Sequence, residues 1–169
     1  MKIKTIQENE LLITSDIMFA YAMQNKEICK GVLERILGRG VSKISYPEGQ
    51  KTIKELLTDK SIRLDVYFVE DDTIKHDIEM QSTNTGNLPK RTRYYHAKID
   101  GYSLRMGEDY NLLNESYVIF LCTFALFKAG IPVYTFRKRC LENPDIFLND
   151  DQTTIFVNLT CTDHRIVCN

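Results

Sequence analysis

The sequence has little of what marks fibrous, disordered or disulfide-stapled proteins. Its 169 residues include only 8 Gly and 4 Pro, and they show no internal repeat or low-complexity tract. With 43% hydrophobic and 27% charged residues, this composition excludes a collagen-like or disordered chain. A chain of this length buries roughly two-thirds of its unfolded surface, so we expect one domain that folds without disulfides or metal.

Cysteine and long hydrophobic runs are also scarce. The five cysteines are odd in number and irregularly spaced, and the first residues lack the apolar segment of a secretory signal. We therefore expect a reducing, cytoplasmic location. The longest apolar run, residues 117–127, is about half as long as a membrane-spanning helix, so we expect no membrane partner. Its β-branched and aromatic residues predict a buried strand.

Net charge is nearly absent. The chain has 22 Lys and Arg against 23 Asp and Glu, a formal charge of −1, so no global field attracts nucleic acid or an anionic membrane. The local charge is more informative, because residues 65–80 carry a charge of −5 and residues 86–105 a charge of +4. The chain therefore places an acidic segment directly before a basic one.

Hydrophobic periodicity predicts a layered α/β (α+β) domain with a central mixed sheet flanked by helices. Helical spacing covers residues 17–37, as one bent helix or two in succession, and a second helix is expected from residue 87 to about 106. Gly38 is expected to end the first helical stretch. Strands are expected over residues 41–46, 62–69, 74–81, 117–123, 133–136 and 154–158.

Two carboxylates can meet across the hairpin expected from residues 62–69 and 74–81. The period-two rule places Glu79 and Gln81 on one face of their strand and Asp65 on the matching face of the other. Asp65 and Glu79, with the backbone carbonyl of Met80, are hard oxygen ligands that suit Mg²⁺ or Mn²⁺. Such an ion activates water and neutralises charge on a phosphate. A solvated strand face is the alternative.

The basic segment predicts a cationic helix face. Arg91 begins a stripe of basic and aromatic residues at helical spacing, whereas Tyr94 lies on the side expected to pack on the sheet. Such a stripe near metal-binding carboxylates suits a phosphodiester backbone. His96 is expected at the surface, and a solvated face is again the alternative. The residues expected to bind DNA are Lys90, Arg91, Arg93, Tyr95, Lys98 and Arg105.

Five separated segments then occur in a characteristic order. They cover residues 14–19, 63–67 (RLDVY), 79–81 (EMQ), 87–95 and 116–124. In this order they resemble the PD-(D/E)XK nuclease family transposases, also called recombination-promoting nucleases, over about residues 11–158. The resemblance implies a restriction-endonuclease-like core in the order helix, three strands, helix, strand. It also implies one nuclease-like domain over residues 1–160 and a short divergent tail over 161–169.

The resemblance implies a Mg²⁺- or Mn²⁺-dependent DNA endonuclease, associated with transposition or recombination, with DNA as its partner and a homodimer as one expected assembly. Asp65 stands for the motif aspartate and Glu79 for the second acid. Gln81 occupies the position of the motif lysine, where a neutral amide can orient water but cannot neutralise charge. Glu34 is a candidate for an additional acid near the metal. The alternative is a catalytically weak or inactive nuclease-fold domain that binds DNA or protein.

Overall fold

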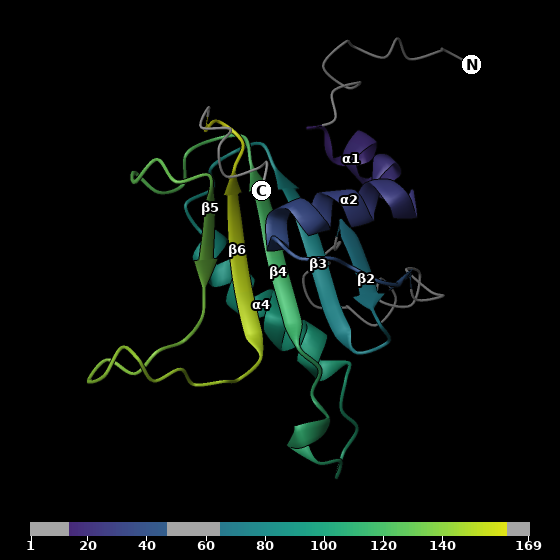
Figure 1. The fold of residues 1–169 in the computed structure, drawn as a ribbon, viewed down its shortest axis with the longest axis vertical. Helices are drawn as coiled ribbons and strands as arrows, with labels where there is room; N and C mark the ends of the chain where they lie inside the picture. Colours follow the sequence, from purple (N-terminus) through teal and green to yellow (C-terminus); the bar gives the residue numbers. More distant parts are fainter. Residues whose placement is uncertain (1–13, 47–64, 162–169) are drawn as a thin grey trace.

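A mixed β-sheet forms the centre of the computed structural model, which describes residues 14–46 and 65–161 (Figure 1). Its six strands lie in the order β1-β2-β3-β4-β6-β5. Strands β3, β4 and β6 are parallel to one another, whereas β1, β2 and β5 pair antiparallel with their neighbours. The strands are β1 (Ile44–Ser45), β2 (Val66–Glu70), β3 (Ile74–Gln81), β4 (Ser116–Cys122), β5 (Val133–Phe136) and β6 (Gln152–Asn158).

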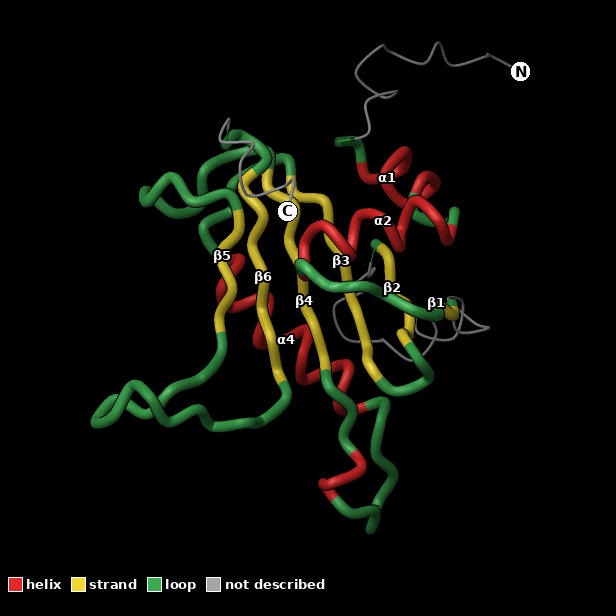
Figure 2. Tube along the Cα trace, viewed as in Figure 1, coloured by secondary structure: helices red, strands yellow, loops and turns green. Residues whose placement is uncertain are grey.

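Helices cover both faces of the sheet (Figure 1). Helices α1 (Asp16–Ala22) and α2 (Lys26–Leu37) lie on one face, and α4 (Leu88–Gly101) lies on the other. A short 3-10 helix, η2 (Tyr110–Leu112), lies between α4 and β4. Figure 2 shows that the segments 102–115 and 137–151 extend beyond the lower end of the sheet, away from the upper end where β3 and β4 stop.

The first helical stretch is two helices rather than one bent helix. They separate at Asn25, whose side chain caps α2 by accepting hydrogen bonds from the backbone N–H groups of Glu27 (3.0 Å) and Ile28 (3.3 Å). Helix α2 ends at Gly38 as predicted. The φ of Gly38 is 65°, in the left-handed region that glycine adopts without steric cost.

The hydrophobic core has two layers, one on each face of the sheet. Strand β4 contributes to both, because Val118 and Phe120 face α4 while Ile119 faces α1 and α2. All three side chains are completely buried, which explains why a central strand reads as one continuous apolar run. The prediction of a buried strand here is confirmed. The predicted fold class, a mixed sheet flanked by helices, is confirmed as well.

The predicted orientation of α4 is wrong. The side chain of Tyr94 is 38% exposed, whereas Tyr95 is only 4% exposed, the reverse of the expectation. Neighbouring residues of a helix differ by about 100° in direction, and the apolar spacing of Leu88, Tyr95 and Ile99 decides which side packs on the sheet. The helix also ends at Gly101 rather than near residue 106, at a residue of low helix propensity.

His96 is buried, so the expectation of a surface histidine is also wrong. Its Nδ1 lies 2.9 Å from Ser116 Oγ, and its Nε2 lies 3.1 Å from Thr154 Oγ1. Burial lowers the pKa of His96 to about 4, so the ring is neutral and joins α4 to two strands by hydrogen bonds. Both hydroxyl partners are distant from His96 in the sequence, so no local pattern predicts these hydrogen bonds.

The strand boundaries differ modestly from the prediction. Strand β1 has only two residues instead of six. Strand β2 begins at Val66, and residues 62–64 of the predicted strand lie outside the described ranges. The hairpin of β2 and β3 forms as predicted, with Val66 opposite Ile78. Among the described residues, no helix combines the length and hydrophobicity that crossing a membrane requires.

Candidate functional site

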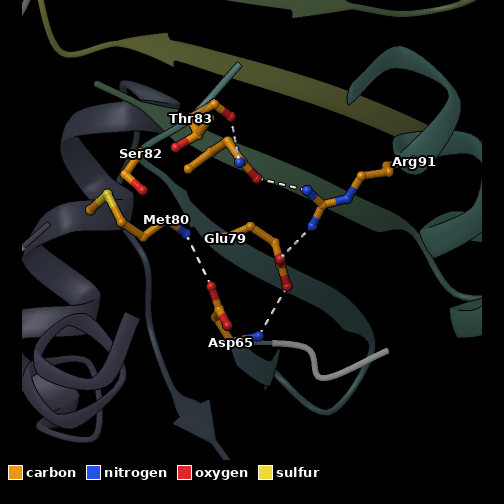
Figure 3. Close-up of a pocket in the computed structure, with 7 residues that line it drawn as sticks. Asp65, Glu79, Met80, Ser82, Thr83 and Arg91 are labelled. Atoms are coloured by element: carbon orange, nitrogen blue, oxygen red, sulfur yellow. Dashed lines mark hydrogen bonds and ion pairs between the residues drawn. The ribbon is translucent and has the colours of Figure 1, made fainter. Parts of the chain in front are cut away.

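A pocket of about 330 Å³ opens where the β2–β3 hairpin meets the first turns of α4 (Figure 3). Asp65 comes directly before β2, Glu79 and Gln81 end β3, and Arg91 lies near the start of α4. Three separate elements therefore bring acidic, amide and basic side chains to one place. The residues that line the pocket are Asp65, Glu79, Met80, Gln81, Ser82, Thr83 and Arg91.

Backbone hydrogen bonds fix the two acids against each other. The backbone N–H of Asp65 donates to Glu79 Oε1 at 2.9 Å, and the backbone N–H of Met80 donates to Asp65 Oδ2 at 3.3 Å (Figure 3). Asp65 and Glu79 come one residue beyond Val66 and Ile78, which form a pair of the β2–β3 ladder. The structure thus brings both carboxylates to the pocket, as the period-two rule predicts.

Glu79 is an unusually buried acid. The residue is only 3% exposed. Its Oε2 accepts hydrogen bonds from Arg91 Nη2 (3.2 Å) and from the Tyr95 hydroxyl (3.4 Å). Burial first, and then the charge of Asp65, raises the pKa of Glu79 to about 7. The donors around Glu79 therefore do not fully compensate its negative charge, and a cation at the pair would favour the ionised form.

Arg91 turns toward the pocket rather than away from the protein. Its Nη1 donates to Gln81 Oε1 at 2.7 Å, and its Nη2 donates to the Tyr95 hydroxyl at 2.6 Å as well as to Glu79. The guanidinium carbon lies 5.3 Å from the ring centre of Tyr95 and 5.1 Å from that of Phe120. Arg91 is therefore held in place by both hydrogen bonds and aromatic contacts.

Asp77 is a further acid at this place that the sequence analysis gave no role. It precedes Glu79 by two residues on the same face of β3 and is completely buried. Neither of its oxygens makes a hydrogen bond of ordinary geometry with a described residue. Burial, followed by the charges of Glu79 and Asp65, raises the pKa of Asp77 well above its ordinary range. The alternation along β3 predicts the face of the strand on which Asp77 lies. The burial of Asp77 depends on the neighbouring strands, which the local sequence does not reveal.

Glu34 does not join the pocket. Its Oε1 accepts a hydrogen bond from the backbone N–H of Val41 at 3.0 Å, and it is absent from the described residues that line the pocket. The carboxylate therefore closes the turn that follows α2. The expectation that Glu34 adds an acid near the metal is not supported by this placement, because a helix position alone does not reveal a side chain's partner.

The residues expected to bind DNA divide into four groups. Lys90 and Arg93 are exposed in the first turns of α4, close in sequence to Arg91. Lys98 lies two turns further along, with its Nζ 5.3 Å from the ring centre of Tyr94. Arg105 lies beyond the far end of α4, a helix of 14 residues that rises about 21 Å. Tyr95 is buried and contacts Arg91 and Glu79, so its predicted exposure to DNA is wrong.

The donor set at the pocket fits a hard divalent cation. In the described part of the chain, no cluster of three or more His, Cys, Asp or Glu side chains is arranged to hold a metal ion. Two carboxylates leave several coordination positions for water and phosphate, which is typical of Mg²⁺ sites and unlike closed structural zinc sites. Glu79, with its raised pKa, also has charge that the protein leaves uncompensated.

A mixed sheet flanked by helices, with an acid pair at the end of a hairpin and a basic helix beside it, is consistent with a nuclease-like domain. A family model described as PD-(D/E)XK nuclease family transposase matches residues 17–165, and the chain belongs to this family. The predicted resemblance is thereby confirmed, and the function is nuclease-related. No curated protein and no solved structure matches the chain.

Proposed function

We propose that this protein is a DNA endonuclease that hydrolyses phosphodiester bonds with a divalent metal ion and acts in transposition or recombination. The observation that carries the proposal is the juxtaposition of Asp65 and Glu79 at an open pocket, beside the cationic start of α4. Membership in a nuclease family supports the same reaction class.

Asp65 and Glu79, with the backbone carbonyl of Met80, are the groups that would hold Mg²⁺ or Mn²⁺. When bound, the ion supplies Lewis acidity toward water and the phosphate. The raised pKa of Glu79 supports this assignment, because a buried acid pair that lacks enough positive charge is a site prepared for a cation.

Gln81 is proposed to orient the attacking water. Its Nε2 donates to the backbone carbonyl of Thr83 at 2.7 Å, and its Oε1 accepts from Arg91. Both ends of the amide are therefore anchored, yet each retains hydrogen-bonding capacity for a water molecule. A fixed amide beside the acid pair can hold water in one direction without changing the charge of the site.

The start of α4 is proposed to hold the DNA backbone. Lys90, Arg91 and Arg93 lie in its first two turns, and the first turn has no acidic residue. The helix dipole makes this end positive, and Arg91 is paired with Glu79, so the exposed cations Lys90 and Arg93 favour a bound anion. A phosphate backbone supplies that anion. Lys98 is proposed to extend the contact along the helix, while Arg105 lies too far along the chain to join it.

Cleavage of supercoiled plasmid tests the proposal. The unmodified protein should nick and linearise the plasmid with Mg²⁺ or Mn²⁺, and Asp65→Ala should lower the rate at least 100-fold. Asp72→Ala is the matched control, because Asp72 is an exposed acid at the tip of the same hairpin. Cleavage by the unmodified protein that is no faster than cleavage by Asp65→Ala would contradict the proposal.

The second candidate is a nuclease-fold module that binds DNA or protein without cleaving. The observation that favours it is the neutral Gln81, where the resemblance implies a motif lysine. This function predicts no calorimetric signal with Mg²⁺ but DNA binding that weakens with salt. Tight Mg²⁺ binding that is lost in Asp65→Ala would count against it.

The cytoplasmic location and the homodimer stay predictions. Cell fractionation would test the first prediction, and sedimentation velocity would test the second. The cysteines that the structure describes are free thiols. These cysteines are Cys29, Cys122, Cys140 and Cys161.

A further inference from the structure

We propose that Arg91, reaching in from α4, supplies at the reaction centre the positive charge that the PD-(D/E)XK motif assigns to its lysine. The inference rests on the proposed nuclease function and adds a catalytic residue to it. Negative charge develops on the phosphate during hydrolysis, and a positive group at the site is needed to offset it. The neutral amide of Gln81 cannot do this as an ammonium group would.

The guanidinium lies at the tip of the side chain in the lysine position. Arg91 Nη1 is 2.7 Å from Gln81 Oε1, and Nη2 is 3.2 Å from Glu79 Oε2. Arg91 therefore spans the second acid and the third position of the motif (Figure 3). A lysine at position 81 has a longer side chain than glutamine and would bring its ammonium group into the same region. Among the described residues that line the pocket, Arg91 is the one cation.

The surrounding residues hold the guanidinium in position before any substrate arrives. The Tyr95 hydroxyl accepts from Nη2 at 2.6 Å, and the Phe120 ring lies against the guanidinium. The Arg91 side chain remains 30% exposed, and a guanidinium has more N–H donors than these contacts use. Arg91 can thus donate to a phosphate oxygen without leaving its place, which is the preorganisation that electrostatic catalysis needs.

The same contacts explain why position 81 holds an amide. A group that faces the guanidinium must accept a hydrogen bond, and glutamine offers a carbonyl oxygen whereas lysine offers only donors. Two cations at this distance would also repel each other. Gln81 and Arg91 therefore form one unit, in which the amide positions the cation and the guanidinium carries the charge.

A charge transplant tests the inference. Arg91→Gln should lower kcat for plasmid cleavage at least 100-fold, whereas DNA affinity measured with Ca²⁺ should fall only a few-fold. The double variant Arg91→Gln/Gln81→Lys should cleave at least tenfold faster than Arg91→Gln, because the introduced lysine returns a positive charge to the site from β3. Gln81→Lys alone should lower activity, because it places two cations side by side. Arg35→Gln is the control, an exposed arginine of α2 on the other face of the sheet.

Mg²⁺ titration by calorimetry gives a readout that does not depend on cleavage. Removing a cation next to the acid pair should tighten Mg²⁺ binding several-fold in Arg91→Gln, and the double variant should reverse this change. Weaker Mg²⁺ binding in Arg91→Gln would instead mean that Arg91 only braces the acids, and it would overturn the inference. Thermal melts establish that each variant is folded, and Arg91→Lys provides a milder change that retains the charge.

The outcomes separate the inference from the function on which it rests. Full-rate cleavage by Arg91→Gln, or a double variant that recovers no activity, overturns the role of Arg91 and leaves the nuclease function standing. No metal-dependent cleavage by the unmodified protein contradicts the nuclease function and the inference together.

Discussion

The backbone N–H of Asp65 donates a hydrogen bond to Glu79 Oε1 at 2.9 Å, which ties the two acids of the candidate site together. This bond favours the ionised form of Glu79, as do the donors Arg91 and Tyr95. Burial and the charge of Asp65 outweigh them, and the pKa of Glu79 rises to about 7. The acid pair is therefore strained electrostatically when no cation is bound, and this strain has measurable consequences for stability and for metal affinity.

Glu79 should make the metal-free protein less stable as the pH rises. A carboxyl group whose pKa is raised by folding binds its proton more tightly in the folded state, so its favourable contribution is complete below about pH 4.5 and is lost as the pH passes 7. Glu79→Gln removes this titration. Urea unfolding in EDTA measures the free energy of unfolding of both proteins. Between about pH 4.5 and 7, the value for the variant should rise relative to that for the unmodified protein by about 2 to 3 kcal/mol. Asp72→Asn is the exposed control, and unfolding free energies that stay parallel across this range would contradict the prediction.

Mg²⁺ affinity should follow the same titration in the opposite sense. The metal binds the ionised pair, so binding below pH 7 must displace a proton from Glu79. As the pH rises toward 7, we expect the dissociation constant for Mg²⁺ to fall by up to about tenfold per pH unit. Above pH 7 it should level off. Calorimetry in buffers of different ionisation enthalpy measures the released proton directly. An affinity that does not change between pH 5.5 and 7.5 would show that Glu79 is not a ligand.

Lys90 should lower the stability of α4 and increase the affinity of the protein for DNA. It lies in the first turn of α4, where a positive side chain opposes the helix dipole. Lys90→Glu should raise the free energy of unfolding by about 0.3 to 1 kcal/mol and should weaken DNA binding with a reduced salt slope. Lys26→Glu at the start of α2 is the matched control, because it offers the same dipole gain on the other face of the sheet. Equal losses of DNA affinity in both variants would argue against a DNA contact at α4.

The sequence predicted the hairpin and its acid pair because the period-two rule acts locally and fixes the face of each residue. It also predicted the helix–strand order, since β4 is strongly apolar and buried. It failed where the answer depends on distant partners. Tyr94 and Tyr95 are equivalent by composition, and only the contact of α4 with the sheet decides that Tyr95 is buried. Arg91 was predicted to face DNA, but its direction depends on acceptors in β3 that no helical spacing reveals.

The second buried ionic cluster lies at the opposite end of the β2–β3 hairpin. Glu70 is 2% exposed, and it accepts hydrogen bonds from Arg39 Nη1 (2.6 Å) and Nη2 (2.9 Å) and contacts the completely buried ring of His76 at 2.9 Å. The His76 ring is stacked between Phe68 and Tyr117, at 4.9 Å from each ring centre. Burial lowers the pKa of His76 to about 4, so Arg39 is the cation that balances Glu70.

Arg39→Ala should therefore destabilise the fold without affecting the candidate site. It leaves the Glu70 carboxylate buried beside a neutral histidine, and losing one partner of a buried pair costs about 3 to 5 kcal/mol. Because the Arg39 side chain is 39% exposed, we expect about 2 kcal/mol. Urea unfolding measures the loss, and Arg35→Ala on the exposed side of α2 should change it little. Adding Glu70→Gln should recover part of the stability, since it removes the unbalanced charge. A double variant less stable than Arg39→Ala would show that Glu70 is held by contacts other than this ion pair.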